Sequence, residues 1–377
     1  GVQTCALPIL IFRNRLISLI IILFASFSSL SARAEYQLET VAEGLDFPWS
    51  IAFLPDGGYL VATRPGELLR ISEQGDVSAP LTGSPETFVE SQGGYFDIML
   101  DSQFATNDLV YLSFAWGSIE ENATRIVKAT LGDAGLENVE VLFTVSPTKA
   151  GGAHYGGKMV QLADGSIVLS TGDGFEYREA AQDKFSQLGK ILRLNTDGSA
   201  HIDNPFADGK SGNPFVWSYG HRNVQGLVVD RASNKIYNHE HGPQGGDEIN
   251  YVEAGNNYGW PAITYGINYS GAFVSPFKEA SGMEQPLKYW TPSIAPSGFA
   301  IYQGDAFPAW QGDFFVGALV NKEVRRLEMV DGKIVSEEAL FSELNARIRD
   351  VRVSPKGLIY LLTDSDSGKI VRVRPKS

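Results

Sequence analysis

The sequence predicts an all-β fold built from six similar units, and three observations support this. Glycine is abundant, at 40 of 377 residues, with 18 prolines, which suits many tight turns. Aromatic residues make up 11% of the chain and favour strands. One pattern of apolar strand, polar turn and second apolar strand recurs along the chain, as in repeat architectures.

The units begin about 45 to 75 residues apart, a spacing typical of repeats that each form one small sheet. Their apolar segments, in chain order, are 50–63 with 66–71; 96–100, 109–113 and 124–129; 158–170 with 189–194; 225–230, 235–237 and 247–251; 298–302, 312–317 and 324–327; and 351–353, 358–362 and 368–372.

Six such units describe a six-bladed β-propeller with four-stranded antiparallel blades around a central channel, because each small sheet buries its faces against its neighbours. A strand predicted over 36–42 would pair with the last unit and close the ring. The alternative is a β-sandwich with coincidentally spaced turns, but a sandwich does not require six similar units.

The N-terminal residues 1–34 are predicted to be a secretory leader. An apolar run over 16–24 follows Arg13 and Arg15 and leads to a small-x-small cleavage pattern at 32–34, as in signal peptides. The run is shorter than the ~20 residues of a spanning helix, so we expect no stable membrane insertion of the mature chain. Residues 1–10 resemble neither signal nor domain and are expected to be artefactual. The propeller is expected to be one domain over 35–377.

Charge and cysteine content narrow the function classes. Cleavage after Ala34 removes three arginines and no acidic residue, leaving 28 basic and 44 acidic residues and a net charge of −16. Nucleic acid is therefore an unexpected partner. The single cysteine, Cys5, leaves with the leader. Export without disulfides favours a periplasmic or secreted bacterial protein that is stable through its core.

Unusual polar residues recur just before the first strand of the second, third, fourth and sixth units, where a propeller gathers them at one mouth of its channel. The fifth unit contributes Lys322 from its turn at 321–323 instead. Four cations should meet there: Arg222, Lys322, Arg347 and Arg349. In an acidic protein a cationic pocket indicates a small ligand with several carboxylates or phosphates. The alternative for each residue alone is a solvated surface charge.

A histidine among glycines is the candidate general base. His154 lies between two glycine pairs, in backbone that allows close approach of a ligand, and an imidazole suits proton transfer near neutral pH. Asp173, at the end of the next strand, is placed to orient that imidazole. A purely structural histidine is the alternative.

The segment 240–251, followed by 256–260, is rich in oxygen donors and lacks cysteine, which suits Ca²⁺. The spacing is not that of an EF-hand. An ordinary turn is the alternative.

Six motifs in order resemble those of the soluble pyrroloquinoline-quinone (PQQ)-dependent glucose dehydrogenases, and more closely their aldose sugar dehydrogenase branch, the glucose/sorbosone dehydrogenases. The resemblance spans residues 45–373. The motifs are Gln-Gly-Gly at 92–94, His-Tyr-Gly-Gly at 154–157, Gly-His-Arg-Asn at 220–223, Glu-His-Gly-Pro with Gly-Gly-Asp-Glu-Ile-Asn at 240–250, Asn-Tyr-Gly-Trp-Pro at 257–261 and Arg-Ile-Arg-Asp-Val at 347–351.

This resemblance implies a catalytic propeller that oxidises aldoses to lactones. His154 would take the anomeric hydroxyl proton while hydride passes to the quinone, with Asp173 supporting it and Arg222 stabilising negative charge. The quinone would be held by Gln92, Arg222, Asn223, Lys322, Arg347 and Arg349.

The resemblance also implies two Ca²⁺ ions and an external electron acceptor. One ion would bind the carbonyls of Gly242 and Pro243 and act as a Lewis acid, and a second would use Glu248 and Tyr258. His241 and the pair Gly245-Gly246 resemble the aldose branch more than the glucose enzyme. We therefore expect a broad aldose range and a monomer.

Two other functions remain open from the residues. A Ca²⁺-dependent propeller lactonase shares six blades and an oxygen-ligated metal, but does not need the cationic cluster. A non-catalytic periplasmic binding propeller would leave His154, Asp173 and the oxygen-rich segment unexplained.

Overall fold

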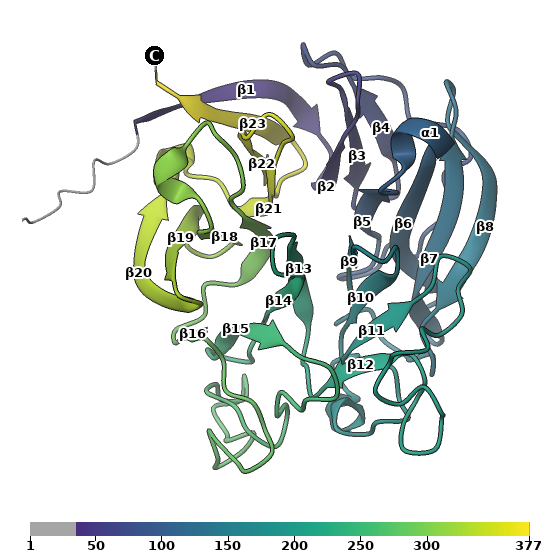
Figure 1. Cartoon of the computed structure of the whole chain (residues 1–377), viewed down its shortest axis with the longest axis vertical. Coiled ribbons are helices and arrows are strands. Elements are labelled where there is room, and N and C mark those ends of the chain that lie inside the picture. The colour runs from purple at the N-terminus through teal and green to yellow at the C-terminus, as the bar shows by residue number, and fades with distance from the viewer. Residues whose placement is uncertain (1–34, 377) are drawn as a thin grey trace, which may run out of the picture. The chain divides into compact units, whose positions relative to one another are not determined.

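Six small antiparallel sheets arranged in a ring make up residues 35–376, the part of the chain that this computed structural model describes (Figure 1). The predicted six-bladed β-propeller is confirmed. The blades comprise β2 (Pro48–Phe53), β3 (Tyr59–Thr63) and β4 (Leu68–Ile71); β5 (Tyr95–Leu100), β6 (Leu109–Gly117), β7 (Asn122–Leu131) and β8 (Leu136–Thr144); β9 (Gly156–Gln161), β10 (Ile167–Thr171), β11 (Lys190–Leu194) and β12 (Val216–Tyr219); β13 (Val224–Asp230), β14 (Lys235–Glu240), β15 (Asp247–Val252) and β16 (Lys288–Trp290); β17 (Pro296–Ile301), β18 (Phe314–Ala318), β19 (Glu323–Val330) and β20 (Lys333–Leu340); and β21 (Ile348–Val353), β22 (Ile359–Thr363), β23 (Gly368–Pro375) and β1 (Tyr36–Leu45).

Helix is confined to single turns within the described residues. They are α1 (Phe104–Asn107), η1 (Arg178–Ala181), η2 (Pro308–Trp310) and η3 (Ser342–Leu344). No helix in residues 35–376 has the length and apolar character needed to cross a membrane. The predicted leader over 1–34 lies outside the described residues.

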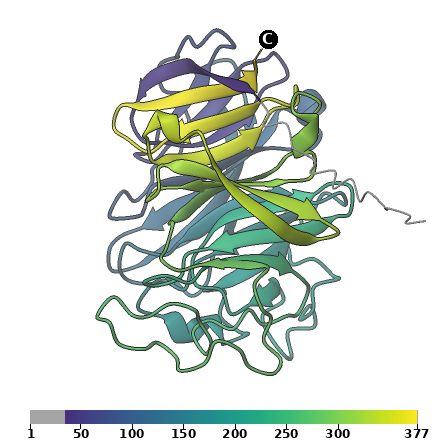
Figure 2. The ribbon, with the colours of Figure 1, turned by 90° about the vertical axis from the view of Figure 1, so that its left-hand side faces the viewer.

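The last blade joins the two ends of the described chain. Strand β1 pairs antiparallel with β23, from Tyr36 opposite Pro375 to Leu45 opposite Gly368, and Figure 2 shows purple β1 beside the yellow C-terminal strands. The predicted closing strand over 36–42 is therefore confirmed.

The first blade differs from the others in its outer edge. It has three regular strands, and the fourth position is taken by the irregular segment 77–81. There Ser78 N–H donates to the Arg70 carbonyl (2.9 Å) and Leu81 N–H to the Leu68 carbonyl (2.8 Å).

The core lies between neighbouring blades because successive side chains of a strand point to opposite faces. In β3, Leu60 and Ala62 belong to an apolar cluster shared with the second blade. Tyr59 and Val61 belong to a cluster shared with the last blade. Each strand thus contributes to two cores, which accounts for its wholly buried pattern.

The innermost strands β2, β5, β9, β13, β17 and β21 contact one another in cyclic order, with β21 returning to β2. They lie near the centre of Figure 1, whereas β8 and β20 lie at the rim. The segments that enter these inner strands therefore converge at one end of the channel, as the sequence predicted.

Candidate active site

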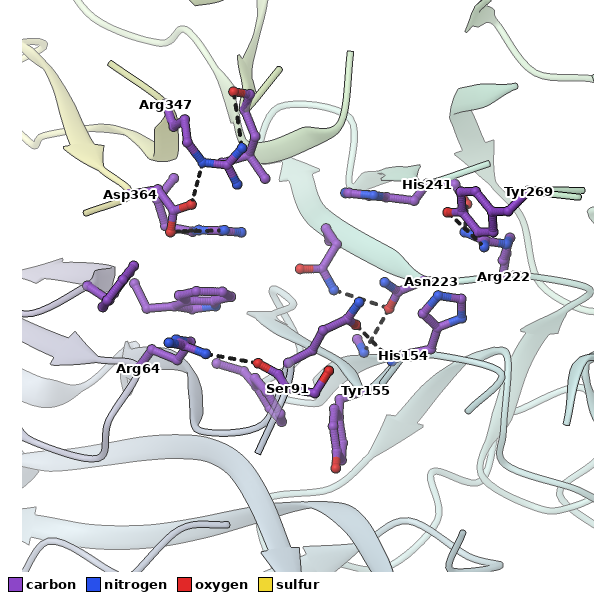
Figure 3. Close-up of a pocket in the computed structure, with 18 residues that line it drawn as sticks. Arg64, Ser91, His154, Tyr155, Arg222, Asn223, His241, Tyr269, Arg347 and Asp364 are labelled. Carbon is purple, nitrogen blue, oxygen red and sulfur yellow. Dashed lines mark hydrogen bonds and ion pairs between the residues drawn. The ribbon is translucent and has the colours of Figure 1, made fainter. Parts of the chain in front are cut away.

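A cavity of about 370 Å³ opens at this end of the channel. It is built from the segments before the inner strands and those after the second strands of the blades (Figure 3). Its lining comprises Phe47, Trp49, Arg64, Ser91, Gln92, Phe96, His154, Tyr155, Gly156, Arg222, Asn223, Gln225, His241, Tyr269, Leu319, Arg347, Arg349 and Asp364.

One wall of the cavity is cationic. Arg347 Nε lies 2.9 Å from one oxygen of Asp364, and Arg349 Nη2 lies 3.1 Å from the other. Burial opposes ionisation of Asp364, but the two guanidinium groups outweigh it and lower the pKa of this carboxyl. Arg349 is only 8% exposed and lies 3.7 Å above the Trp49 ring. Two cations thus share one carboxylate, and Arg64 also lines the cavity, so the wall keeps an excess of positive charge.

His154 lies on the opposite wall (Figure 3). Its backbone is left-handed, with φ of 53°, and its N–H donates to Gln92 Oε1 (2.9 Å). Its Nδ1 lies 2.6 Å from Asp173 Oδ1. An ionised carboxylate only accepts hydrogen bonds, so Nδ1 carries the proton and Nε2 is left as a base. The prediction that Asp173 orients this imidazole thus agrees with the geometry.

Asp173 is itself held by two further hydrogen bonds. Trp260 Nε1 donates to Oδ2 (2.7 Å) and the Phe175 N–H donates to Oδ1 (2.8 Å). The carboxylate is completely buried. Burial opposes its ionisation, but the hydrogen bond to His154 and the charge of Arg222 lower its pKa.

Burial also determines the protonation of His154. Burial lowers the pKa of the imidazole, whereas the hydrogen bond to Asp173 raises it. The charges of Arg222 and Lys149 lower the pKa further, so that it falls below the ordinary 6.5. The side chain is therefore neutral at pH 7 and able to accept a proton.

Arg222 separates the cavity from the segment 240–251. Its Nη1 donates to the carbonyls of Gly242 (2.7 Å) and His241 (3.1 Å), and its guanidinium lies 5.2 Å from the Trp260 ring centroid. No acceptor within residues 35–376 lies within hydrogen-bond distance of its buried Nε. An unpaired buried donor is costly, so this atom fits an anionic ligand in the cavity.

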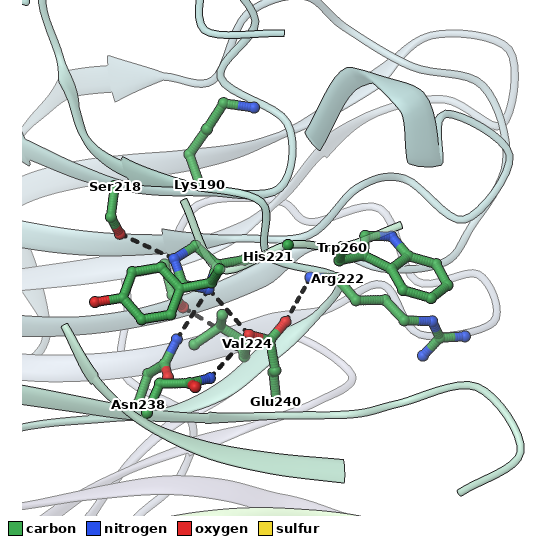
Figure 4. A network of polar contacts seen from close by, with 12 residues as sticks. Lys190, Ser218, His221, Arg222, Val224, Asn238, Glu240 and Trp260 are labelled. Atoms are coloured by element: carbon green, nitrogen blue, oxygen red, sulfur yellow. Dashed lines mark hydrogen bonds and ion pairs between the residues drawn. The ribbon is translucent and has the colours of Figure 1, made fainter. Parts of the chain in front are cut away.

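The backbone of Arg222 is fixed by a buried polar network (Figure 4). Its N–H donates to Glu240 Oε2 (2.5 Å). The other oxygen of Glu240 lies 2.9 Å from His221 Nδ1, and His221 Nε2 lies 2.9 Å from Ser218 Oγ. The Ser-His-Glu series is fully buried, so it positions Arg222 and does not meet substrate.

The predicted metal ligands lie together on this side. The Gly242 carbonyl accepts a hydrogen bond from Arg222 Nη1, and Pro243 lines a neighbouring cavity. Glu248 lies opposite Glu240 across β14 and β15. Burial and the charge of Glu240 raise the pKa of Glu248, and a bound cation would relieve this repulsion.

Tyr258 borders the same narrow cavity as Glu240 and Glu248. Its hydroxyl donates to the Tyr251 carbonyl (2.6 Å), and its ring stacks on His221 at 4.7 Å. Within the described residues, no three His, Cys, Asp or Glu side chains form a metal-binding group. The predicted sites therefore depend on carbonyl oxygens and on the carboxylate pair.

The comparison that decides the family covers almost the whole propeller. Residues 45–372 match the glucose/sorbosone dehydrogenase family. The chain belongs to this family. It is 38% identical over 353 residues to the aldose sugar dehydrogenase YliI of Escherichia coli, covering 92% of this chain and 95% of that protein.

Solved structures agree with this family membership. The apo-form of the soluble aldose sugar dehydrogenase from Escherichia coli has a TM-score of 0.87 at 37% identity, covering 90% of this chain and 100% of that one. The PQQ-bound form of an aldose sugar dehydrogenase from Streptomyces coelicolor has a TM-score of 0.75 at 27% identity, covering 91% and 99%.

One predicted cofactor residue of this glucose/sorbosone dehydrogenase lies apart from the rest. Lys322 is on the exposed turn between β18 and β19 and does not line the cavity. Its Nζ lies 3.5 Å from Asn345 Oδ1. The adjacent wall is formed instead by Leu319 and Arg347. A quinone role for Lys322 stays a prediction that requires its flexible side chain to reach inward.

Sequence reasoning missed several lining residues, and a positional rule would have found them. Arg64, His241, Leu319 and Asp364 come directly after second strands of blades. In an antiparallel blade the end of the second strand lies beside the start of the first, so both reach the same mouth. Asp173, which follows β10 in the same way, was found because its side chain could orient a base.

Proposed function

We propose that this protein is a PQQ- and Ca²⁺-dependent aldose sugar dehydrogenase. It would oxidise the anomeric carbon of aldoses to lactones and deliver the electrons to an external acceptor. The observation that carries the proposal is the neutral His154, aligned by Asp173, facing a wall of arginines across one cavity. Family membership and a relative described as PQQ-bound add support.

The arginine wall suits the carboxylates of the quinone. Arg347 and Arg349 offer planar donors that bind carboxylates in a bidentate manner, and the unpaired Nε of Arg222 supplies a donor from the other side. Gln92 and Asn223 line the same cavity. We propose that these five residues, with Lys322 from the rim, hold the cofactor.

The proton and the hydride leave the sugar by different routes. Nε2 of His154 accepts the proton of the anomeric hydroxyl, and Asp173 stabilises the resulting imidazolium. Arg222 stabilises negative charge that develops on oxygen. When bound, the quinone would supply the acceptor for the C1 hydride, and Ca²⁺ would supply Lewis-acid polarisation of that acceptor.

Ca²⁺ would bind at the Gly242 carbonyl, which now accepts a hydrogen bond from the guanidinium of Arg222. We propose that the Gly242 and Pro243 carbonyls would hold this ion. A second ion would lie between Glu248 and Tyr258 and maintain the shape of the segment.

A second cavity of about 360 Å³ provides room for the sugar. It shares Arg222 and Tyr269 with the first cavity, and its other walls include Phe175 and Trp260. Phe175 lies edge-on to His154 at 5.0 Å. Aromatic walls with a few polar groups are typical of small-molecule sites, and the exposure of Phe175 and Tyr269 fits a broad aldose range.

We further propose that the enzyme is exported to the periplasm and acts as a monomer, with no nucleic-acid partner. Export depends on the predicted leader, and the absence of a nucleic-acid partner depends on the charge of −16 of the chain after cleavage. The monomer depends on the resemblance of His241 and Gly245-Gly246 to the aldose branch.

The deciding experiment is dye-linked oxidation of several aldoses by the apoprotein, with and without PQQ and Ca²⁺. Activity that requires both cofactors supports the proposal. A quinone-induced rise in Tm without activity would indicate a binding propeller, and lactone hydrolysis with Ca²⁺ alone would indicate a lactonase. Either result would refute the dehydrogenase.

A further inference from the structure

A buried lysine lies behind the His154–Asp173 pair. The side chain of Lys149 is 3% exposed. Its Nζ donates to Asn122 Oδ1 (2.8 Å) and to the Gly151 carbonyl (2.9 Å), and it lies 3.8 Å from the Tyr155 ring centroid. No carboxylate within residues 35–376 lies within 4 Å of it. A buried charge without a close counter-ion is costly, and the hydrogen bonds of Lys149 Nζ offset part of this cost.

The ammonium holds the backbone that leads to His154. The Gly151 carbonyl accepts hydrogen bonds from Lys149 Nζ and from Asn122 Nδ2 (3.0 Å). Three residues later His154 adopts its left-handed backbone, which is unfavourable for a side chain with a Cβ and persists only where the surroundings impose it. Lys149 is part of those surroundings.

The aliphatic part of the same side chain packs against the segment that carries Asp173. A Cβ at Gly174 would lie 2.6 Å from Lys149 Cδ, so only glycine leaves room for the lysine. Lys149 therefore contacts both chain segments whose side chains form the His154–Asp173 hydrogen bond.

The positive charge of Lys149 acts on the His154–Asp173 pair. The charged groups that act on His154 are Asp173, Arg222 and Lys149, with His241 farther along the cavity. Burial lowers the pKa of Lys149 to about 8, which Asp173 opposes. The lysine is thus mostly protonated at pH 7, and its charge adds to the lowering of the pKa of His154.

We propose that Lys149 is a positioning residue for the catalytic base: it holds the Gly151 carbonyl and packs against the segment that carries Asp173, so that His154 meets Asp173. The inference rests on the proposed role of His154 as the base. It adds a residue that touches neither substrate nor cofactor.

The test compares Lys149→Met with Lys190→Met. Lys190 is a matched control, because it is also buried and is also influenced by Asp173, while its Nζ binds the carbonyls of Ala180, Ala181 and Leu188 away from the His154 segment. NMR of the imidazoles in the apoprotein follows the His154 titration directly. His154→Asn assigns its signal among five histidines.

In Lys149→Met we expect the pKa of His154 to rise by about one unit. With PQQ and Ca²⁺, kcat should fall about tenfold while KM and quinone affinity change less than about threefold, and the acidic limb of the pH profile should move to higher pH. In Lys190→Met the pKa of His154 should be the same as in the wild-type protein.

If folded Lys149→Met keeps the wild-type His154 pKa and kcat, the inference is overturned. It is also overturned if the His154 pKa rises by the same amount in Lys190→Met. If Lys149→Met does not fold, Lys149→Gln, which keeps a donor without the charge, must show the pKa rise or the inference fails. If the wild-type protein has no dehydrogenase activity, the proposed function is overturned. A rise of the His154 pKa in Lys149→Met would in that case still support the electrostatic effect of Lys149.

Discussion

At the scale of single residues, the site places one neutral base opposite several cations. His154 keeps a lowered pKa because burial and nearby positive charge outweigh its bond to Asp173. The arginines stay charged because guanidinium groups retain their protons even when buried. This division allows proton transfer on one wall and anion binding on the other.

Replacing the base separates these two roles. In His154→Asn we expect kcat to fall by about 10²- to 10⁴-fold, because general-base catalysis contributes that much. Quinone affinity, measured by titrating the apoprotein with Ca²⁺ present, should remain within a factor of about three. Activity near that of wild type would remove His154 from the mechanism.

Removing a buried arginine should weaken quinone binding, in contrast to the loss of kcat expected for His154→Asn. Arg349→Ala is expected to weaken quinone binding about 10- to 100-fold, since a charge-assisted hydrogen bond contributes about 1.5–3 kcal/mol. The same titration measures this, with the exposed Arg231 replaced by alanine as control. Equal affinities in the two variants would contradict the binding assignment.

The pH dependence follows from the lowered pKa of His154. Below that pKa the imidazole is protonated and cannot act as a base, so activity is lost as pH falls through it. We expect the acidic limb of kcat/KM to have its midpoint below 6.5, the ordinary histidine value. A midpoint above 6.5 in a dye-linked assay would show that another group controls this limb.

At the scale of elements, the segment between β14 and β15 depends on one aspartate. Asp247 is completely buried; its Oδ1 accepts the Gly242 N–H, and its Oδ2 accepts from Ser293 Oγ and the Ile294 N–H. The carboxylate therefore joins the carbonyl-rich turn to the strand entering the fifth blade.

Removing this carboxylate should destabilise the whole fold. Asp247→Ala leaves several buried donors without an acceptor, each costing about 1–3 kcal/mol, so we expect a loss of about 3–5 kcal/mol. Urea unfolding measures it, with the exposed Asp133 replaced by alanine as control. A loss below about 1 kcal/mol would show that the donors find other partners.

At the scale of the whole propeller, ring closure depends on β1. This strand forms the outer edge of the last blade by pairing with β23, and it buries Ala42 and Leu45 in the cluster shared with the first blade. The N-terminal segment thus supports both blades that meet at the closure.

Deleting β1 should open this closure. A chain starting at residue 47 is expected to melt about 10 °C below one starting at residue 35. The deletion removes several kcal/mol of strand pairing and apolar burial, and each kcal/mol lost lowers Tm by about 2–4 °C. Thermal unfolding of both chains measures it. Equal Tm values would mean that the ring closes without β1.

The sequence by itself determined the repeat, the closing strand and most of the polar residues at the channel mouth. These features are local, since alternation of apolar residues and turn residues follows from strand geometry. His154 and Asp173 could be paired in advance because one glycine-flanked segment and the following strand contain them.

Only the tertiary structure decided which side chains actually meet. Arg64 and Asp364 join Arg347 and Arg349 because the ring brings the first and last blades together, and Lys322 lies outside the cavity on an exposed turn. Lys149 gains its place behind His154 through Asn122, 27 positions away. Such contacts depend on the docking of blades, which no local pattern encodes.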